Sequence, residues 1–217
     1  MEELRPSLRP LEYEAGRIIF EEGEPVFGVY LINRGKVKLA KRSPGGRRQI
    51  LKLVGPGEIL GEEALFHEPV YSAHARALER TETGFVTIEE LRAFLEAHPR
   101  VALKLLEHLS QEIKGFQNKL LETSYESSLE RIARLLLSIA DKWGEEGDGG
   151  LYIGVRLSRR ELAELAGVAS ETASRLLARL REREILALDG ARIIILDRER
   201  LEELAEPLCV DLRESLL

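Results

Sequence analysis

The sequence is poor in cysteine and in aromatic residues. Its 217 residues contain one cysteine, one methionine and one tryptophan, and aromatic residues make up 6% of the chain. With Cys209 as the single thiol, the chain cannot form an internal disulfide or supply the several thiolates of an iron–sulfur or structural zinc site. We therefore expect a protein of a reducing compartment in which Cys209 is a small buried residue.

Long hydrophobic runs are missing as well. No stretch approaches the roughly 20 apolar residues of a transmembrane helix, and the first ten residues lack the basic-then-apolar order of a signal peptide. Hydrophobic residues still make up 44% of the chain, which is enough for a buried core. These features predict a soluble, cytoplasmic protein of two modest domains with no membrane partner.

The chain as a whole has no excess of positive charge. It carries 32 lysines and arginines against 38 acidic residues, and the net charge of −6 argues against a protein that coats nucleic acid indiscriminately. Between residues 156 and 183, however, there are seven arginines against four glutamates. A local basic face on an acidic protein predicts a specific DNA reader, because its phosphate contacts are confined to one surface.

Glycine turns interrupt the N-terminal part of the chain. From Tyr13 to Ile88, short β-branched and apolar runs such as RIIF, VYLI, KVKLA, QILKLV and GFVTI alternate with glycines. Short strands at regular spacing with glycine turns are typical of an antiparallel barrel or sandwich. We expect this region to form the first domain.

A different pattern begins at Pro99 and predicts a long helix over residues 99–123. Apolar residues recur there in steps of three and four, which is the pattern of a coiled-coil seam. The seam consists of Leu106, Leu109, Ile113, Phe116 and Leu120. Its partner is either the β domain of the same chain or the same helix of a second copy in a symmetric dimer.

The remaining sequence predicts helices and a hairpin after a hinge at Ser124–Ser128. The stretch LERIARLLLSIADKW predicts an amphipathic helix, GEEGDGG a solvated loop and LYIGVRL a strand. The segment ILALDGARIIIL predicts a hairpin that turns at Asp189-Gly190. Helices followed by a hairpin make a winged helix, so we expect a second, DNA-binding domain here.

Within this second domain, two helices joined by a short turn are predicted. Ser158 can cap the first helix, Gly167 allows a tight turn, and Ser170 can cap the second helix. Apolar residues on one face of each helix are expected to be buried, namely Leu162, Leu165, Ala166, Ala173, Leu176, Leu177 and Leu180. This is the helix-turn-helix arrangement, whose second helix enters the major groove of DNA.

The opposite face of the second helix carries a polar cluster. Glu171, Ser174 and Arg175 recur there at i, i+3 and i+4. In the major groove, arginine can pair with guanine and glutamate can accept a hydrogen bond from the cytosine amino group. The alternative is a solvated helix face with an intrahelical ion pair between Glu171 and Arg175.

The order of these parts resembles the CRP/FNR family of bacterial transcription factors, named after the cyclic AMP receptor protein and the fumarate–nitrate reductase regulator. The resemblance covers nearly the whole chain and is carried by GEPVFGVYLINRGKVKLAK, GPGEILGEEALF, LERIARLLL and LSRRELAELAGVASETASRLLARL. It implies an α+β fold with an antiparallel β-roll like that of cyclic nucleotide-binding domains, a long dimerisation helix and a winged helix-turn-helix. The expected divisions are residues 1–98, 99–126 and 127–217.

The resemblance also implies DNA-binding roles. Arg175 matches the family arginine that pairs with a half-site guanine, and Glu171 matches the glutamate that accepts from cytosine. Ser174 matches a serine of the fumarate–nitrate branch, whereas Ser170 stands where the receptor branch has a second base-reading arginine, which implies a TTGA-like half-site. Arg159 matches a phosphate-contacting residue. The full expected set is Arg175, Glu171, Ser174, Ser170, Thr172 and Arg159.

The effector pocket departs from the receptor branch. Family members that bind cyclic AMP carry Gly-Glu and then Arg-Ser, whereas here Gly61 and Glu62 are followed by Tyr71 and Ser72. Without the arginine, a cyclic phosphate loses its strongest charge-assisted partner. We therefore expect Gly61, Glu62 and Ser72 to form a vestigial pocket in which Glu62 serves the fold. The effector is expected to be something other than cyclic AMP, or there is none.

No cofactor or metal is expected. His67 and His74 in a β domain are more often surface or hydrogen-bonded residues than haem ligands. The sequence offers no nucleophile–base pair or phosphate loop with catalytic spacing, so we do not expect an enzyme. The principal hypothesis is a homodimeric activator that binds a palindromic DNA site and RNA polymerase. The alternative is a ligand-sensing regulatory subunit that acts through protein–protein contacts.

Overall fold

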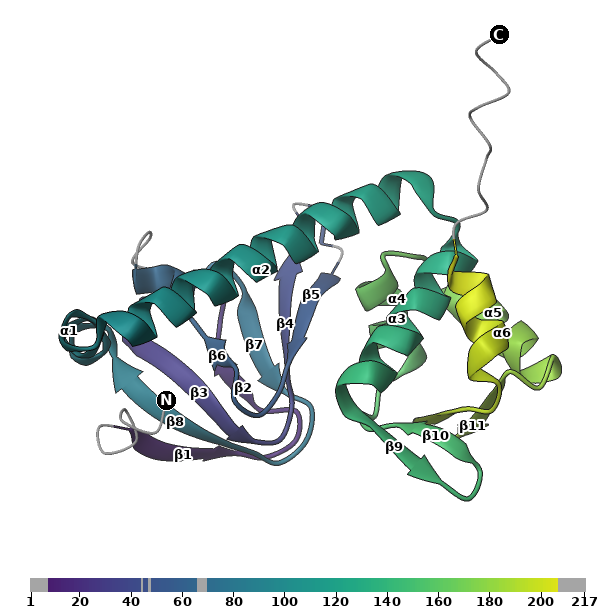
Figure 1. Ribbon diagram of the computed structural model, residues 1–217, viewed down its shortest axis with the longest axis horizontal. Helices are drawn as coiled ribbons and strands as arrows, with labels where there is room; N and C mark the ends of the chain where they lie inside the picture. Colours follow the sequence, from purple (N-terminus) through teal and green to yellow (C-terminus); the bar gives the residue numbers. More distant parts are fainter. Residues whose placement is uncertain (1–7, 44, 47, 66–69, 207–217) are drawn as a thin grey trace, which may run out of the picture. The chain divides into compact units, whose positions relative to one another are not determined.

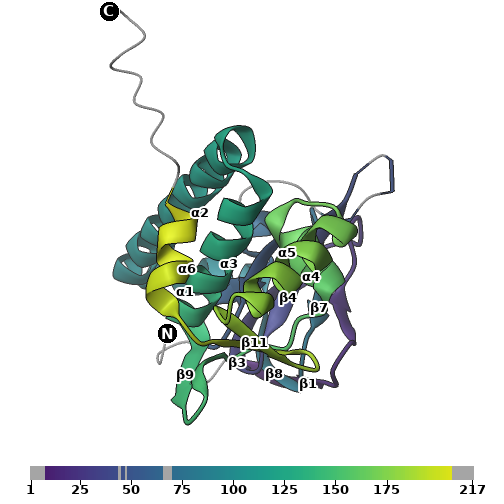
Figure 2. The same ribbon diagram turned by 90° about the vertical axis from the view of Figure 1, so that its right-hand side faces the viewer.

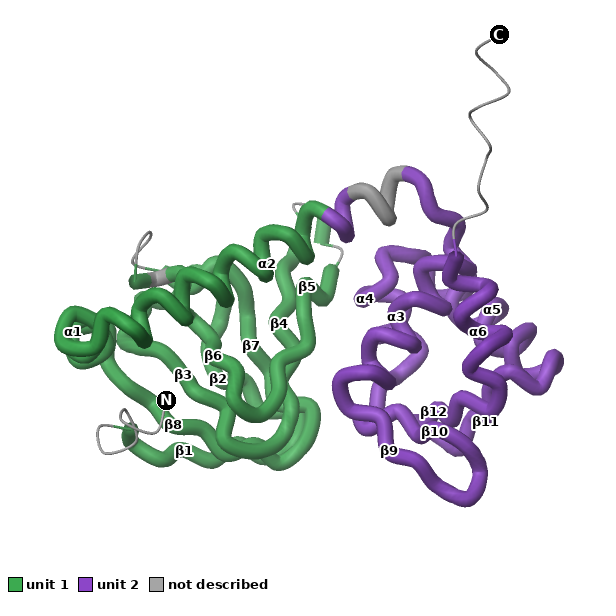
Figure 3. The backbone as a smooth tube through the Cα atoms, in the orientation of Figure 1, with its two compact units in different colours: residues 1–117 green, residues 118–217 purple. Residues whose placement is uncertain are grey.

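The computed structural model (Figures 1 and 2) describes residues 8–43, 45, 46, 48–65 and 70–206, without the side chains of residues 64 and 121–124. The chain divides into two compact units, residues 1–117 and residues 118–217 (Figure 3). Cys209 and His67 lie outside the described residues, so their predicted roles stay untested. Within the described part, no helix is long and apolar enough to cross a membrane.

The first unit is built on two antiparallel sheets of four strands each. One sheet has the strand order β1-β8-β3-β6 and the other the order β2-β7-β4-β5 (Figure 1). The strands are β1 (Arg9–Tyr13), β2 (Ile18–Phe20), β3 (Gly28–Arg34), β4 (Val37–Arg42), β5 (Arg48–Val54), β6 (Ile59–Leu60), β7 (His74–Ala77) and β8 (Thr81–Thr87). The predicted β-roll is confirmed, and the apolar runs of the sequence contribute strands to both sheets.

Alternation along the strands separates the core of the roll from its surface. On β7, Ala75 and Ala77 are buried, whereas His74 and Arg76 are only half-buried. Successive side chains of a strand point to opposite faces, so β7 carries its polar residues on the outer face of the sheet. The buried cluster between the sheets includes Phe20, Ile32, Val37, Val54, Leu60 and Tyr71.

Two helices follow the roll. Helix α1 (Ile88–Ala97) begins with a capping box, in which the Thr87 hydroxyl accepts from the Glu90 N–H at 3.2 Å and the Glu90 carboxylate accepts from the Thr87 N–H at 3.0 Å. Helix α2 (Pro99–Tyr125) begins at a proline, which suits the first helical position because no N–H is needed there. The sequence does not predict α1, and α2 ends at Tyr125 rather than at residue 123.

The second unit combines helices with a small antiparallel sheet. The helices are α3 (Ser128–Trp143), α4 (Arg159–Ala166), α5 (Ser170–Glu182) and α6 (Arg198–Ala205). The four-stranded sheet has the order β11-β12-β10-β9, with β9 (Gly144–Gly147), β10 (Gly150–Ile153), β11 (Leu186–Asp189) and β12 (Arg192–Ile195). Fully buried side chains join these elements: Ile132, Leu136, Leu177, Leu180, Ile195 and Leu201. The predicted winged helix-turn-helix is confirmed.

Some local predictions in this unit are wrong. The segment GEEGDGG is not a loop, because residues 144–147 form strand β9, which pairs antiparallel with β10. Its glycines and glutamates have low strand propensity, and backbone pairing with a neighbouring strand outweighs that preference. The hairpin turns at Gly190-Ala191, since Asp189 still pairs with Arg192. The expected hinge is also shorter, because α2 runs to Tyr125 and Ser127 caps α3.

Candidate nucleic-acid interface and effector pocket

Helix α4 begins with a complete capping box, as its sequence predicts. The Ser158 hydroxyl accepts from the Glu161 N–H at 3.2 Å, and the Glu161 carboxylate accepts from the Ser158 N–H at 2.8 Å. Leu162, Leu165 and Ala166 are buried, which confirms the predicted packing face. Arg159 lies in the first turn of α4 and is exposed, so its guanidinium is free to meet a ligand from solvent.

A tight turn joins α4 to α5. Gly167 adopts the left-handed conformation with φ 65° and ψ 38°, which L-residues rarely adopt. The next helix starts at Ser170 with Ala169 as its N-cap, and no side chain caps it. The predicted cap by Ser170 is therefore wrong, because Ser170 is already the first helical residue. The first N–H groups of α5 have no side-chain acceptor and can donate to solvent or to a bound anion.

Helix α5, labelled in Figure 2, has two faces that differ in burial and polarity. Ala173, Leu177 and Leu180 are almost fully buried, and Leu176 is half-buried rather than buried as predicted. The predicted polar face is solvent-accessible: Ser170, Glu171 and Arg175 are exposed, and Thr172 and Ser174 are half-buried. The structure thus places Glu171 and Arg175, with Ser174 beside them, on one accessible face of α5.

Glu171 and Arg175 do not form the intrahelical ion pair that the alternative interpretation requires. Among the described residues, no ion pair involves either side chain. Comparable pairs at the same i, i+4 spacing do form elsewhere in this unit, between Arg160 and Glu164 at 2.9 Å and between Arg198 and Glu202 at 2.7 Å. The exposed face of α5 therefore keeps a carboxylate and a guanidinium available for an external partner.

The apolar seam predicted on α2 is largely exposed. The exposed fractions are 52% for Leu106, 59% for Ile113, 46% for Phe116 and 70% for Leu120, while Leu109 is half-buried. A different face of the helix packs on the roll, where Leu105 lies against the apolar cluster that includes Val29 of β3 and Val86 of β8, and Val101 lines an adjoining apolar cavity. The β domain of the same chain therefore does not cover the seam in the described structure.

The expected effector pocket contains an ion-pair network in which Glu62 is buried and Lys52 and Glu112 are half-buried. Glu62, only 5% exposed, accepts from the Lys52 ammonium at 3.3 Å, and the same ammonium contacts the Glu112 carboxylate of α2. The imidazole of His108, one turn earlier on α2, lies 3.6 Å from Glu112. Sheet and helix are thus joined here by charged side chains of the chain itself, which agrees with the expectation that Glu62 serves the fold.

Burial and pairing act in opposite directions on this network. Burial raises the pKa of Glu62 above its ordinary value, an effect that the positive charge of Lys52 opposes. Burial also acts to lower the pKa of Lys52, but Glu62 and Glu112 outweigh it and hold that pKa above its ordinary value. Lys52 therefore stays charged at neutral pH. Ionised Glu62 is less favourable than a carboxylate in water, because burial disfavours its charged form.

Tyr71, which stands where the resemblance led us to expect an arginine, belongs to the core. It is 3% exposed, its ring stacks on Phe20 with centroids 3.9 Å apart, and its hydroxyl donates to the Gly28 carbonyl at 2.9 Å. A Cβ added at Gly61 would lie 3.0 Å from the Tyr71 ring. Ser72 donates to Glu63 at 2.5 Å instead of facing a ligand. Of the three pocket residues, only Glu62 therefore projects a charged group into the site.

One group of side chains has the composition of a metal site. Ligand atoms of Glu62, His108 and Glu112 all lie within 4.8 Å of one another. The Lys52 ammonium already contacts both carboxylates, so a metal cation would have to displace a charged lysine. The donor set therefore fits a structural ion pair better than a resident metal.

Comparison with known proteins agrees with this architecture. Residues 10–98 match the cyclic nucleotide-binding domain and residues 130–204 match the Crp-like helix-turn-helix domain. The chain is 34% identical over 193 residues to the cyclic AMP receptor protein of Thermus thermophilus, covering 89% of this chain and 86% of that protein. It is 30% identical over 198 residues to a CRP-like cAMP-activated global transcriptional regulator of Mycobacterium tuberculosis, covering 91% and 88%. The chain belongs to the CRP/FNR family of transcription regulators.

Solved structures share the fold of this CRP/FNR regulator. FixK2 from Bradyrhizobium japonicum has a TM-score of 0.80 at 28% identity, covering 92% of this chain and 98% of that one. A CRP-family transcriptional regulator from Thermus thermophilus has a TM-score of 0.75 at 27% identity, covering 90% and 96%. The regulator is therefore a DNA-binding protein of the helix-turn-helix class, as the sequence predicts.

The sequence analysis missed Lys52, His108 and Glu112. A signal for Lys52 is present, because Ile50 and Val54 on the same strand are buried and a period of two places Lys52 on their face. No comparable signal marks His108 and Glu112, since α2 is polar on most of its surface. Their role depends on which turn of α2 lies over β5.

We expect the substitution Glu62→Gln to change stability in a pH-dependent way. A carboxyl whose folded-state pKa is raised contributes stability below its unfolded pKa and loses that contribution as the pH rises through the folded value. The free energy of unfolding of Glu62→Gln, relative to the parent, should therefore increase as the pH rises above the unfolded-state pKa of a glutamate, about 4.3. Urea unfolding at several pH values measures this, with Glu89→Gln as the control for losing an exposed carboxylate. A difference that stays flat or falls with pH contradicts the raised pKa.

Proposed function

We propose that this CRP/FNR regulator binds a palindromic DNA site as a homodimer and activates transcription in the cytoplasm through contact with RNA polymerase. In this proposal α5 reads TTGA-like half-sites, α2 forms the dimer interface, and cyclic AMP is not the effector. The observation that carries the proposal is the accessible face of α5, on which Glu171 and Arg175 form no ion pair with any described residue.

The chemistry of this face suits base reading better than general DNA binding. An arginine can donate two hydrogen bonds to guanine, and a glutamate can accept one from the cytosine amino group. A carboxylate beside phosphates is repelled by them, so Glu171 is favourable mainly where a base amino group compensates its desolvation. Ser170, Thr172 and Ser174 lie in the first two turns of α5, near Glu171 and Arg175, and can complete the half-site contacts. The N–H groups at the uncapped N-terminus of α5 and the exposed guanidinium of Arg159 can donate hydrogen bonds to phosphates of the DNA backbone.

The exposed seam of α2 supports the homodimer. Leu106, Ile113, Phe116 and Leu120 expose about half or more of their side chains, and burying each large apolar side chain contributes on the order of 1–2 kcal/mol. Spacing in steps of three and four suits the same helix of a second copy. A two-fold dimer would also present two copies of α5 to two half-sites about one helical turn apart.

The filled pocket supports independence from cyclic AMP. Tyr71 occupies the position of the phosphate-binding arginine, and Lys52 connects Glu62 of the roll to Glu112 of α2 without any ligand. A ligand shifts a conformational equilibrium only through its differential affinity for the two states. Without a guanidinium group to bind the cyclic phosphate, the difference in affinity of cyclic AMP for the two states is expected to be small.

The activator role rests on relatives. The regulator is 29% identical over 197 residues to the transcriptional activator protein Anr of Pseudomonas aeruginosa. Activation requires contact with the transcription machinery, and RNA polymerase is therefore the proposed protein partner.

We expect substitutions on α5 to separate base reading from phosphate contact. Arg175→Ala should lower affinity for the selected site by about 1–3 kcal/mol and relax preference at one base pair. Glu171→Ala should lose specificity while keeping or gaining non-specific affinity. Arg159→Ala is the matched control. It should weaken binding to all DNA sequences about equally, and it should reduce the steepness of the plot of log K against log salt concentration by about one. Selection from random DNA followed by salt-dependent titration measures all three. An unchanged consensus for both Arg175→Ala and Glu171→Ala would falsify base reading by α5.

We expect the dimer to dissociate when charge is placed on the seam of α2. Ile113→Glu, alone or with Phe116→Glu, puts carboxylates into the apolar interface, and each must be desolvated if the dimer is to persist. Sedimentation equilibrium should then show monomers with weakened binding to a palindromic site. Gln111→Glu adds the same charge at an exposed position off the seam and should remain dimeric. A persistent dimer of Ile113→Glu/Phe116→Glu assigns dimerisation to another surface.

We expect no saturable binding of cyclic AMP in the micromolar range. Calorimetric titration of the full chain, and titration of its binding site in the presence of cyclic AMP, should give unchanged heats and unchanged DNA affinity. The relative from Mycobacterium tuberculosis, whose name describes it as cAMP-activated, is the positive control under the same conditions. Saturable binding that also raises DNA affinity overturns this part of the proposal.

A further inference from the structure

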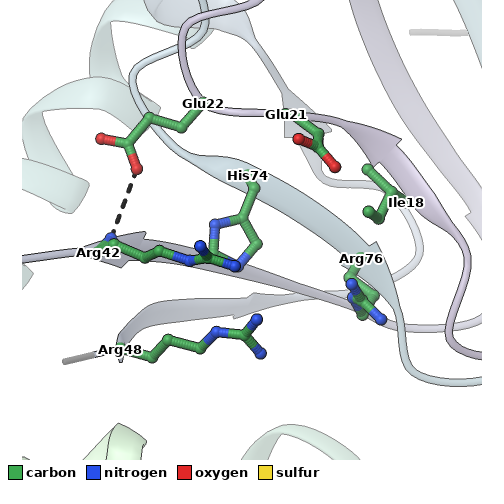
Figure 4. Close-up of a pocket in the computed structure, with 7 residues that line it drawn as sticks. All are labelled: Ile18, Glu21, Glu22, Arg42, Arg48, His74 and Arg76. Carbon is green, nitrogen blue, oxygen red and sulfur yellow. Dashed lines mark hydrogen bonds between the residues drawn. The ribbon is translucent and has the colours of Figure 1, made fainter. Parts of the chain in front are cut away.

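A pocket on the outer face of the β2-β7-β4-β5 sheet gathers cationic side chains. Its cavity has a volume of about 220 Å³ and is lined by Ile18, Glu21, Glu22, Arg42, Arg48, His74 and Arg76 (Figure 4). In Figure 4 the three guanidinium groups and the His74 ring surround one part of the pocket, and the two glutamates lie on the other side. The cavity is smaller than the 300–1,000 Å³ typical of drug-sized ligands, so it suits a small polar molecule.

Strand register forces like charges together in this pocket. Arg42 and Arg48 are direct cross-strand partners at the end of the β4–β5 pair, and His74 of β7 pairs with Ala40 of β4. Like charges directly opposite each other on neighbouring strands are destabilising. The arrangement therefore costs folding free energy in the absence of a ligand.

The positive charge of the pocket is poorly neutralised by the chain. Among the described residues, neither the Arg42 nor the Arg48 guanidinium forms an ion pair or hydrogen bond, and Arg76 donates only to the Gly16 carbonyl at 3.1 Å. Glu22 accepts from the Arg42 backbone N–H at 3.4 Å and lies 3.8 Å from the Lys41 ammonium, not at either guanidinium. The planar guanidinium groups of Arg42 and Arg48 are therefore both available to donate hydrogen bonds to one bound anion.

We propose that this pocket binds a small molecule that carries a phosphate group. The planar guanidinium group of an arginine can donate two hydrogen bonds to the oxygens of one phosphate, which a lysine ammonium cannot do in the same bidentate way. A concave site with converging side chains favours a small anion over the flat contact typical of an acidic protein surface. Glu21 and Glu22 on the far side can accept hydrogen bonds from hydroxyl or amino groups on the rest of the molecule.

His74 offers a local reporter of the bound anion. Burial, followed by the charges of Arg48, Arg42 and Arg76, lowers the pKa of its imidazole below the ordinary value, and Glu22 opposes the shift. A phosphate bound among these groups favours the imidazolium and must raise that pKa. The sequence contains four histidines, so Cε1–H signals in NMR spectra can be assigned with His74→Gln.

The test is a titration of the full chain with inorganic phosphate and pyrophosphate, followed by NMR at constant ionic strength. We expect a saturable shift of the His74 signal and a raised His74 pKa, with the signals of the other histidines unchanged. Arg48→Gln should weaken binding about tenfold or more, because a charge-assisted fork is lost. Arg48→Lys, which keeps the charge but not the fork, should be intermediate. Arg34→Gln, which removes an exposed arginine from the other sheet, should bind like the parent.

Three outcomes overturn the proposal. The first is a His74 shift that sodium chloride reproduces at equal ionic strength, and the second is an equal loss of binding in Arg48→Gln and Arg34→Gln. The third is saturable binding of an acidic peptide that Arg48→Gln weakens, while phosphate and pyrophosphate do not bind. That result would make the surface a protein-docking site. No DNA is present in the measurement, so its failure leaves base reading by α5 untouched.

Discussion

A lysine ammonium held between two carboxylates sets how α2 lies on the β-roll. Lys52 faces inward from β5 and contacts Glu62 of the roll and Glu112 of the helix. A charge removed from water is strongly unfavourable unless it is paired, so α2 must keep Glu112 over Lys52. With the helix in this rotation, Leu105 packs on the roll and the apolar seam lies on an adjoining face, largely in solvent.

The same network lies at the expected effector site, where Lys52 contacts both Glu62 and Glu112. Tyr71 extends the aromatic core through its stack on Phe20 and its hydrogen bond to Gly28. Roll and helix are therefore joined here by side chains of the chain itself.

In the DNA-binding unit, the ends and the rotation of the helices are set mainly by residues close together in the sequence. A capping box starts α4, a left-handed glycine ends it, and buried leucines fix the rotation of α5, so its polar residues have to face outwards. The absence of a pair between Glu171 and Arg175, set against the closed pair of Arg160 and Glu164 on α4, distinguishes the presented face from an ordinary solvated one.

The sequence by itself indicated an antiparallel β domain, the long helix, the helix-turn-helix and the exposed face of α5, because each follows from the period of apolar residues, a glycine or a cap within a few positions. The β-roll was implied only by the family resemblance. Only the tertiary structure decided that residues 144–147 form a strand, that Lys52 meets Glu112, and that Arg42 and Arg48 share a pocket with His74. These contacts join segments far apart in the chain. Their geometry depends on strand register and helix rotation, and periodicity within one segment carries no information about either.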